Sequence, residues 1–136
     1  MASELKVDKF TGVTTAGSIL VTGEGNSTTT NLQQGLAKAW VAFDGTASGA
    51  TVADSLNVSS SDDDGTGDYG INFTNAMGNA NYSCTFGDGE GSSTSGMRFL
   101  MDAGSTTSSQ EIYGRNVSNS AADCAAASMA INGDLA

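Results

Sequence analysis

The chain has 136 residues; 15 are Asp or Glu, five are Lys or Arg and none is His, so its formal net charge is −10 at pH 7. This charge repels phosphates and anionic lipid, so we expect no nucleic-acid partner and no membrane insertion. The length fits one domain with an appended arm, and no apolar run approaches the length of a membrane span. The first residues, MASELKVDKF, contain no signal-peptide core. We therefore expect the chain to be made in a cytoplasm.

Residues 1–36 are predicted to be an N-terminal attachment and oligomerisation arm. The two extended pieces within it, LKVD and SILVT, are too short to bury much surface alone. An arm of this kind becomes ordered by packing on sister subunits or on a docking partner. The alternative is a frayed N-terminus.

A short helix is predicted near residues 28–36. The Ser/Thr cluster before it can cap a helix, and Leu32 and Leu36 lie four residues apart on one face. We predict that Leu32, Gln33, Leu36 and Trp40 lie in a contact between subunits. The alternative is a surface helix that covers one end of the following domain.

From residue 37 onwards, apolar residues alternate with polar ones as in β-strands that have one buried face. Residues 59–67 contain no apolar side chain, and we predict that they form the turn-rich connection of an antiparallel hairpin between residues 52–58 and 69–73. Residues 37–136 are therefore predicted to be an all-β knob domain, an antiparallel β-sandwich of jelly-roll or Greek-key type. The alternating sets are Ala37, Ala39, Val41 and Phe43; Val52, Leu56 and Val58; Tyr69, Ile71 and Phe73; and Tyr82, Cys84 and Phe86.

The last third of the chain is predicted to hold a polar loop at residues 87–96 and strands at 97–101 and 110–117. Residues 124–135 are rich in Ala, which favours a helix, whereas the alternation of Ala127, Met129 and Ile131 favours a strand. We predict a strand. Its small residues would let sheets or subunits approach closely.

The sequence contains no motif for a catalytic nucleophile. Without His, neither a Ser–His nor a Cys–His pair can form. A carboxylate pair could hydrolyse a glycosidic bond, but the candidates lie in predicted turns rather than in a rigid cleft. We therefore expect no catalytic residue and no enzyme activity. The carboxylates concerned are Asp62, Asp63, Asp64, Asp68, Asp88 and Glu90.

Two further features have a simple and a specific interpretation. The run DDDGTGD, with Asp62, Asp64 and Asp68, faintly resembles a calcium loop, but its Gly is misplaced and no Glu closes it, so we favour a solvated turn and predict no metal and no cofactor. Cys84 and Cys124 are predicted to be reduced, buried residues in strands. A single disulfide between them is the alternative.

Several segments resemble small tail-fibre-like virion proteins of marine tailed bacteriophages. The most telling are KAWVAFDGT and DDDGTGDYGINFT, supported by LKVDKFT near the start and INGDLA at the end. The resemblance covers nearly the whole chain. It implies a non-enzymatic virion protein, assembled in the host cytoplasm as a homotrimer and docked on other virion proteins through its arm.

Three other functions stay open in the sequence. A capsid decoration or head-fibre protein differs from a tail-associated one only by its location on the particle. A glycan-binding host-attachment module would contact host sugars through polar loops, with Asp88, Glu90, Tyr113 and Arg115 as the candidate receptor-facing residues. A depolymerase is the function that we expect least.

Overall fold

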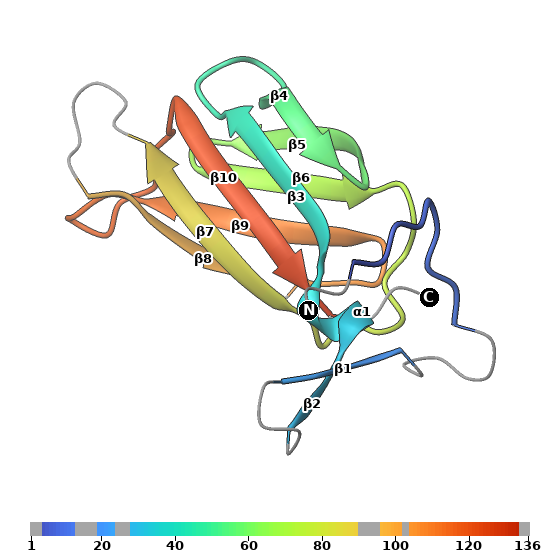
Figure 1. Ribbon diagram of the computed structural model, residues 1–136. Coiled ribbons are helices and arrows are strands. Elements are labelled where there is room, and N and C mark those ends of the chain that lie inside the picture. The colour runs from blue at the N-terminus through green and yellow to red at the C-terminus, as the bar shows by residue number, and fades with distance from the viewer. Residues whose placement is uncertain (1–3, 13–18, 24–27, 90–95, 102–103, 134–136) are drawn as a thin grey trace. The chain divides into compact units, whose positions relative to one another are not determined.

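The computed structural model describes residues 4–12, 19–23, 28–89, 96–101 and 104–133 (Figure 1). The chain divides into two compact units, Met1–Leu36 and Ala37–Ala136. The division falls where the sequence changes from the predicted arm to the predicted strands.

The N-terminal unit contains a two-stranded antiparallel ribbon and one helical turn. Strands β1 (Leu20–Thr22) and β2 (Thr29–Asn31) pair with Leu20 opposite Asn31, and α1 (Leu32–Gly35) follows at once. The predicted helix near residues 28–36 is therefore wrong in its first half. The threonines expected to cap it are β-branched, and they extend as a strand instead.

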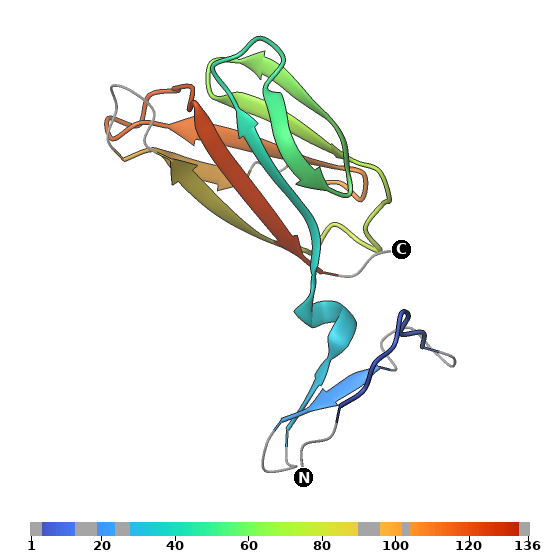
Figure 2. The same ribbon diagram turned by 45° about the horizontal axis from the view of Figure 1, so that its top comes forward.

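The C-terminal unit consists of two four-stranded antiparallel sheets, which confirms the all-β class. Their strand orders are β4-β3-β10-β7, here called the β3 sheet, and β5-β6-β9-β8, here called the β6 sheet. Figure 2 shows them as two layers. The strands are β3 (Ala37–Asp44), β4 (Thr51–Leu56), β5 (Val58–Gly65), β6 (Asp68–Phe73), β7 (Ser83–Gly89), β8 (Arg98–Met101), β9 (Ser109–Arg115) and β10 (Ala126–Asn132).

Both sheets contribute to a single core. Phe43 of β3 meets Tyr69 of β6 edge to face, with ring centroids 5.3 Å apart, and Phe73 meets Tyr82 in the same way at 5.9 Å. The alternation predicted for β6 and β10 is confirmed, including the final Ala-rich strand. In β3 it holds from Ala39 to Phe43, but Ala37, which is predicted to face the core, is exposed, and Lys38 is buried. The buried apolar residues of these three strands are Ala39, Val41, Phe43, Tyr69, Ile71, Phe73, Ala127, Met129 and Ile131.

The predicted hairpin is wrong in its first strand and in its connection. Residues 52–58 are not one strand: at Asn57 the backbone has φ 57°, and the chain leaves β4 in the β3 sheet to enter β5 in the β6 sheet. The polar residues from 59 onwards are a strand, with Ser61 opposite Ile71 and Asp63 opposite Tyr69. Because β5 is an edge strand and mostly exposed, it carries no apolar residue after Val58.

Smaller differences occur elsewhere. The strand predicted at 110–117 ends at Arg115, and the residues that follow form a turn in which the Asn116 side chain accepts hydrogen bonds from the backbone N–H groups of Ser118 and Ser120. Strand β7 continues to Gly89, into the predicted polar loop. Residues 90–95 of that loop lie outside the described part of the chain.

Candidate functional site

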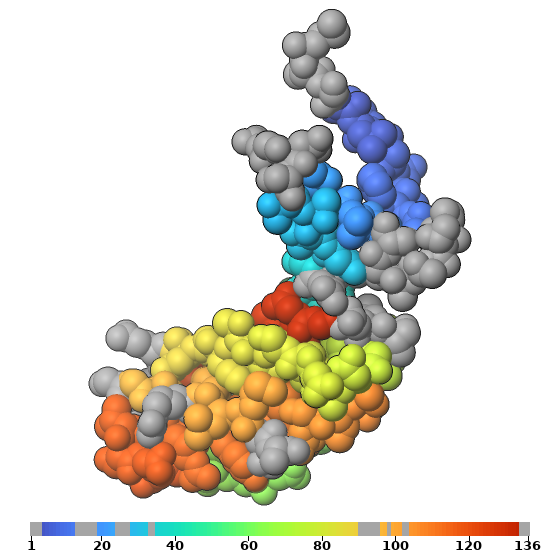
Figure 3. Space-filling model, turned by 90° about the horizontal axis from the view of Figure 1, so that it is seen from below, coloured from blue at the N-terminus to red at the C-terminus, as the bar shows by residue number. Residues whose placement is uncertain are grey.

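Large apolar side chains of the N-terminal unit lie on its surface. None of the side chains that the structure describes in this unit is buried. Figure 3 shows residues 4–12 (dark blue) as an extended run of chain. Six apolar residues each expose between 51% and 72% of their surface: Leu5, Val7, Phe10, Leu20, Val21 and Leu36.

The ribbon of the N-terminal unit is apolar on both faces. Successive residues of a strand point to opposite sides. Leu20, which pairs with Asn31, therefore lies on one face, and Val21, which pairs with Thr30, lies on the other. Both side chains are more than half exposed. A single covering surface could bury only one of them.

The four residues predicted at a subunit contact are divided between the two units, and the contact stays a prediction. Leu32 is half-buried, and its N–H donates to the carbonyl of Ile19 at 2.9 Å. Leu36 is exposed at the end of the N-terminal unit, whereas Trp40 is half-buried in β3 of the other unit. The side chain of Gln33 lies outside the described part.

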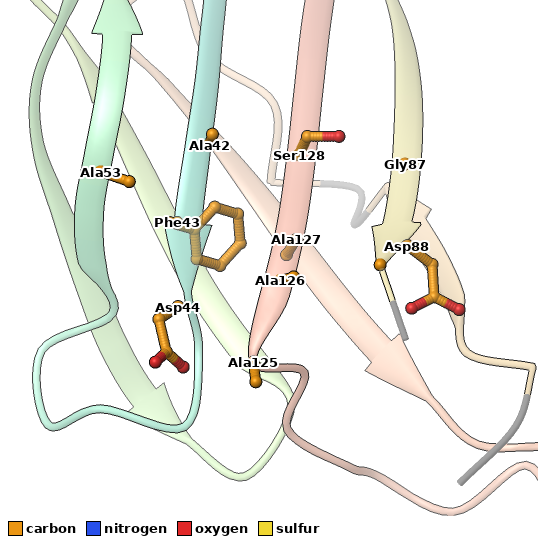
Figure 4. A pocket seen from close by; sticks show the side chains of 11 residues that line it. Ala42, Phe43, Asp44, Ala53, Gly87, Asp88, Ala125, Ala126, Ala127 and Ser128 are labelled. Carbon is orange, nitrogen blue, oxygen red and sulfur yellow. The ribbon is translucent and has the colours of Figure 1, made fainter. Parts of the chain in front are cut away.

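The outer face of the β3 sheet carries small side chains and is hollowed. A hollow of about 450 Å³ lies over β10, between Asp44 on one side and Asp88 on the other (Figure 4). An adjoining hollow of about 330 Å³ extends to Trp40. We call this surface the small-residue face; the outward side chains that define it are Ala42, Ala53, Ala126, Ser128 and Ala130, together with Gly87 and Gly89.

Close approach of β7 to β10 leaves no room for larger side chains at two glycines of this face. Gly87 lies directly opposite Ser128, and a Cβ on Gly87 would collide with the Ser128 hydroxyl. A Cβ on Gly89 would lie 2.7 Å from the Cβ of Ala126. Ala and Gly are poor strand formers, so local propensity does not explain why they occupy these outward positions.

The small-residue face is bordered by carboxylates. Asp54 is exposed and lies opposite Ala42, and Asp44 lines the larger hollow. Asp88 pairs with the core-facing Ala127 and accepts hydrogen bonds from the Met97 N–H and the Cys124 thiol, so its carboxylate lies on the inner side of the sheet. Hydrogen bonds from Thr46, donated by its hydroxyl and its N–H, lower the pKa of Asp44. The four strands of this sheet contain a single cation, Lys38, and it is buried. The face therefore presents negative charge.

The outer face of the β6 sheet carries charges of both signs near β8. The guanidinium carbon of Arg115 lies 5.4 Å from the centroid of the Tyr113 ring, within the range of a cation–π contact. Leu100 lies opposite Tyr113 in the register of β8 and β9, and the backbone of Arg98 lies opposite Arg115. Asp68 of β6 lies opposite Tyr113 on the other side of β9, and Glu111 shares the outer face with Arg115, so carboxylates and the guanidinium are mixed on this surface. The side chain of Arg98 lies outside the described part.

The three predicted receptor-facing residues that the structure describes are distributed over two sheets. Tyr113 and Arg115 lie in strand β9 rather than in a loop, while Asp88 lies in β7 of the β3 sheet and accepts a hydrogen bond from the N–H of Met97 at 3.0 Å. Glu90 lies outside the described residues. The structure therefore brings two of the four together.

The acidic run at residues 62–64 belongs to β5 and is not a turn. Asp62 accepts a hydrogen bond from the Asn72 amide at 2.6 Å, and both flank Gly70 on the outer face of the sheet. Among the described residues, no group of three or more metal-ligating side chains comes together.

Both cysteines are free thiols in the structure. Cys84 is half-buried in β7, whereas Cys124 is buried but precedes β10, so the prediction that both lie in strands is wrong for Cys124. Burial raises the pKa of Cys84 to about 11, and it also raises the pKa of Cys124. Neither thiol is therefore activated as a nucleophile. No disulfide joins Cys84 to Cys124 in the structure, and their reduction in the cell stays a prediction.

One buried polar contact could not be predicted from the sequence. The Tyr69 hydroxyl lies 3.2 Å from the carbonyl oxygen of Gly45 and 3.1 Å from Asp123 Oδ1, and Asp123 also accepts the N–H of Gly67 at 2.6 Å. Burial, and then the charge of Asp123, raise the pKa of Tyr69. Nothing in the sequence distinguishes Asp123 from the other acidic residues. This contact joins the β5–β6 turn to the segment before β10.

In the described part of the chain, no helix is long and apolar enough to cross a membrane. Compared with known proteins, the chain matches no family model, no curated protein and no solved structure.

Proposed function

We propose that this chain is a structural protein of a bacteriophage virion, tail-fibre-like or tail-associated, that catalyses no reaction and assembles as a trimer through its N-terminal unit. The observation that carries the assembly is the exposed apolar surface of that unit, where Leu20, Val21 and Phe10 are each more than half exposed. Surface of this kind gains free energy when a partner covers it. The virion context comes from the sequence resemblance.

A threefold assembly suits the two-sided ribbon better than a twofold one. In a twofold dimer each copy has one neighbour, and the same patch meets itself. In a ring of three, each copy has two neighbours, so the Leu20 face can meet one copy and the Val21 face the other. The ribbon has apolar side chains on both faces, as this arrangement requires.

In the same proposal the C-terminal unit is a Greek-key β-sandwich that serves as a rigid knob. Two sheets share one core, and the non-consecutive pairs β3–β10 and β6–β9 require the chain to cross between layers. A fold of this kind holds its outer faces in fixed positions. It can therefore present surfaces to neighbouring copies or to other virion proteins.

The mass of the purified chain in solution tests the assembly. Light scattering after size-exclusion chromatography is expected to give three times the chain mass for the wild type. The double variant Leu20→Asp/Val21→Asp should lower this mass, while Thr107→Asp, an exposed position in the other unit, should leave it unchanged. A wild-type chain that stays monomeric at micromolar concentration would contradict the proposal.

The location on the particle distinguishes the two virion alternatives. A cryo-EM map of a phage that carries this chain should show the knob on the tail or its fibres. Density on the capsid shell would favour the decoration or head-fibre function instead. Absence of the chain from purified particles would refute a virion role altogether.

We rank a glycan-binding host-attachment module second. Tyr113 and Arg115 lie together on the β6 sheet and could contact a sugar, but Asp88 lies on the other sheet. A glycan array probed with the wild type and with Tyr113→Ala tests this function. Binding that the substitution abolishes would favour it over a purely architectural role.

A further inference from the structure

Three of the four edge strands that the structure describes in the C-terminal unit discourage pairing with a further strand. An edge strand invites such pairing because one row of its backbone N–H and C=O groups has no partner in the sheet. Strand β5 carries three consecutive aspartates, β4 carries Asp54, and the register of each strand is shifted against its neighbour. Strand β8 has only four residues, and Arg98 is the first of them.

Strand β7 has none of these features. Its seven residues pair with β10 without a register shift, and no described strand pairs with its other edge (Figure 1). Its one charged residue, Asp88, directs its carboxylate to the inner side of the sheet. A further strand can therefore be added along a regular edge. The residues on the outer face of β7 are small and uncharged: Ser83, Thr85, Gly87 and Gly89.

The core beside β7 is incompletely covered. Phe86 of β7 and Phe99 of β8 belong to different sheets, and their ring centroids lie 6.1 Å apart. Both side chains are half-buried, as are those of Cys84 and Met97, whereas Met129 on the neighbouring strand β10 is buried. A strand added to β7 would extend the β3 sheet over these half-buried side chains. The apolar surface that it covers would stabilise the contact.

Residues 4–7 of the N-terminal unit, here called the donor segment, have the properties of an unpaired strand. Lys6 Nζ lies 3.4 Å from Glu4 Oε1, so these two side chains lie on one side of the chain. Leu5 and Val7 alternate with them and are 72% and 51% exposed. The backbone bends at Asp8, and residues 4–12 make no backbone hydrogen bond with another described residue. The donor segment thus has one apolar side and one charged side.

We propose that the donor segment of one copy pairs with the outer edge of β7 in a neighbouring copy and adds a fifth strand to its β3 sheet. Leu5 and Val7 then lie on the inner side, over Phe86 and Phe99, and the charged side chains that alternate with them face water. This arrangement is the usual one for a sheet with one solvated face. Main-chain hydrogen bonds supply the affinity, and the alternating side chains supply the specificity.

A neighbouring copy is the partner because a single copy leaves both strands without one in its described part. This inference rests on the proposed trimer, which raises the effective concentration of donor segments around each β7 to about the millimolar range. A strand of four residues is then sufficient. In a ring of three, each copy gives one donor segment and receives one, so the exchange closes and no β7 edge is left for further addition.

Engineered disulfides between two kinds of full-length chain test the pairing. Both chains carry Cys84→Ala and Cys124→Ala, which remove the native thiols. One chain bears an affinity tag and a new cysteine in the donor segment, and the other bears Thr85→Cys on the outer face of β7. The two are co-expressed and mildly oxidised. Covalent heterodimers are counted on a non-reducing gel, and circular dichroism checks that every variant is folded.

Strand pairing predicts that cross-linking alternates along the donor segment. Glu4→Cys or Lys6→Cys should give heterodimers with Thr85→Cys, because side chains on one face of two paired strands lie close enough for a disulfide. Leu5→Cys and Val7→Cys are the matched controls. They point to the opposite face and should cross-link more slowly by about tenfold.

Hydrogen exchange in the otherwise wild-type trimer gives a second readout. An added strand protects the amides on the outer edge of β7, and β10 protects the others. The double variant Leu5→Asp/Val7→Asp should therefore speed exchange by about tenfold at every second residue of β7. The variant Glu4→Gln/Lys6→Gln changes the outer side of the donor segment and should leave the exchange unchanged.

The outcomes separate this inference from the trimer itself. If the wild type is trimeric but no position of the donor segment cross-links to position 85, or all four cross-link equally, the strand pairing is overturned and the trimer stands. If the cross-link forms only in a chain that carries both new cysteines, the donor segment pairs within its own chain, and exchange between copies is overturned. A monomeric wild type refutes both proposals.

Discussion

Replacing Gly67 by Ala should strongly destabilise the C-terminal unit, although it adds only one methyl group. Gly67 is buried between β5 and β6 and has φ +66°, a conformation that L-residues rarely adopt. Its N–H donates to Asp123 at 2.6 Å and its carbonyl accepts from the N–H of Gly114 at 2.8 Å. A Cβ would collide with the carbonyl oxygen of Gly114 and would lie 2.8 Å from the backbone of Ala122.

The expected decrease in the free energy of unfolding is the sum of three contributions. The left-handed backbone costs about 1–2 kcal/mol with a side chain. Overpacking costs about 1–3 kcal/mol, in this case against backbone atoms that cannot rotate away. Ala also lowers the conformational entropy of the unfolded chain, which offsets about 0.4–1 kcal/mol of this destabilisation. The net loss is roughly 3 kcal/mol, which should lower the melting temperature of a unit of this size by on the order of 10–20 °C.

Gly49→Ala is the matched control. Gly49 also has a positive φ, +86°, but a Cβ there would meet nothing within 4 Å. Gly49→Ala should therefore lower the free energy of unfolding by about 1 kcal/mol, from backbone strain alone. Urea unfolding followed by the fluorescence of Trp40, which lies in the same unit, measures both. Equal losses in the two variants would refute the steric argument.

Three further outcomes can be checked directly. Tyr69→Phe should lower the free energy of unfolding by about 1–3 kcal/mol in urea titrations, because Asp123 loses a hydrogen-bond donor in a partly buried place; an unchanged midpoint would contradict this. Burial raises the pKa of Cys84 from 9.0 to about 11, so as the pH rises the thiol loses its proton in the unfolded chain before it does so in the folded one. The free energy of unfolding should therefore fall as the pH rises from 9.0 to about 11, and it should fall less steeply in Cys84→Ala. Hydrogen bonds from Thr46 hold the pKa of Asp44 below its ordinary 3.8, so the folded chain favours the carboxylate form, and the contribution of this carboxylate to stability disappears as the pH falls through the folded pKa. Thr46→Val should therefore raise the titration midpoint of Asp44 measured by NMR. An unmoved midpoint would show that another group causes the shift.

Alternation predicts strands well where one face is buried and the other is wet. In β3 the residues Ala39, Val41 and Phe43 point into the core as expected, and in β10 Met129 and Ile131 do so despite the high helix propensity of the surrounding Ala. Burial of one face decides the outcome in both strands. Intrinsic propensity, which favours a helix for β10, has less weight than packing.

The same signal fails where a strand has no buried face or where the chain changes sheet. Strand β5 is a polar edge strand, so its side chains resemble those of a turn. At Asn57 a single residue with φ 57° moves the chain from one sheet to the other, and the apolar residues on either side of it still look like one strand. Asn tolerates this conformation, but the sequence contains many Asn residues that do not adopt it.

The surfaces are less predictable than the core. The sequence indicates that small residues near the C-terminus could allow close approach, but not that Ala126 and Ser128 line a hollow with Ala42 of a distant strand. Nor does it indicate that Arg98 and Arg115 occupy opposite positions on two strands. Both juxtapositions depend on strand register between segments far apart in the chain, which local patterns do not determine.

The polar edge strand β5 also affects how the protein behaves at high local concentration. An uncovered strand edge can add a strand from another copy, and repeated addition leads to fibrils. In this chain the edge carries Asp62, Asp63 and Asp64 in succession, so two such edges repel each other before their backbones can pair. Many copies can therefore be crowded together without joining through β5, and their association is left to other surfaces.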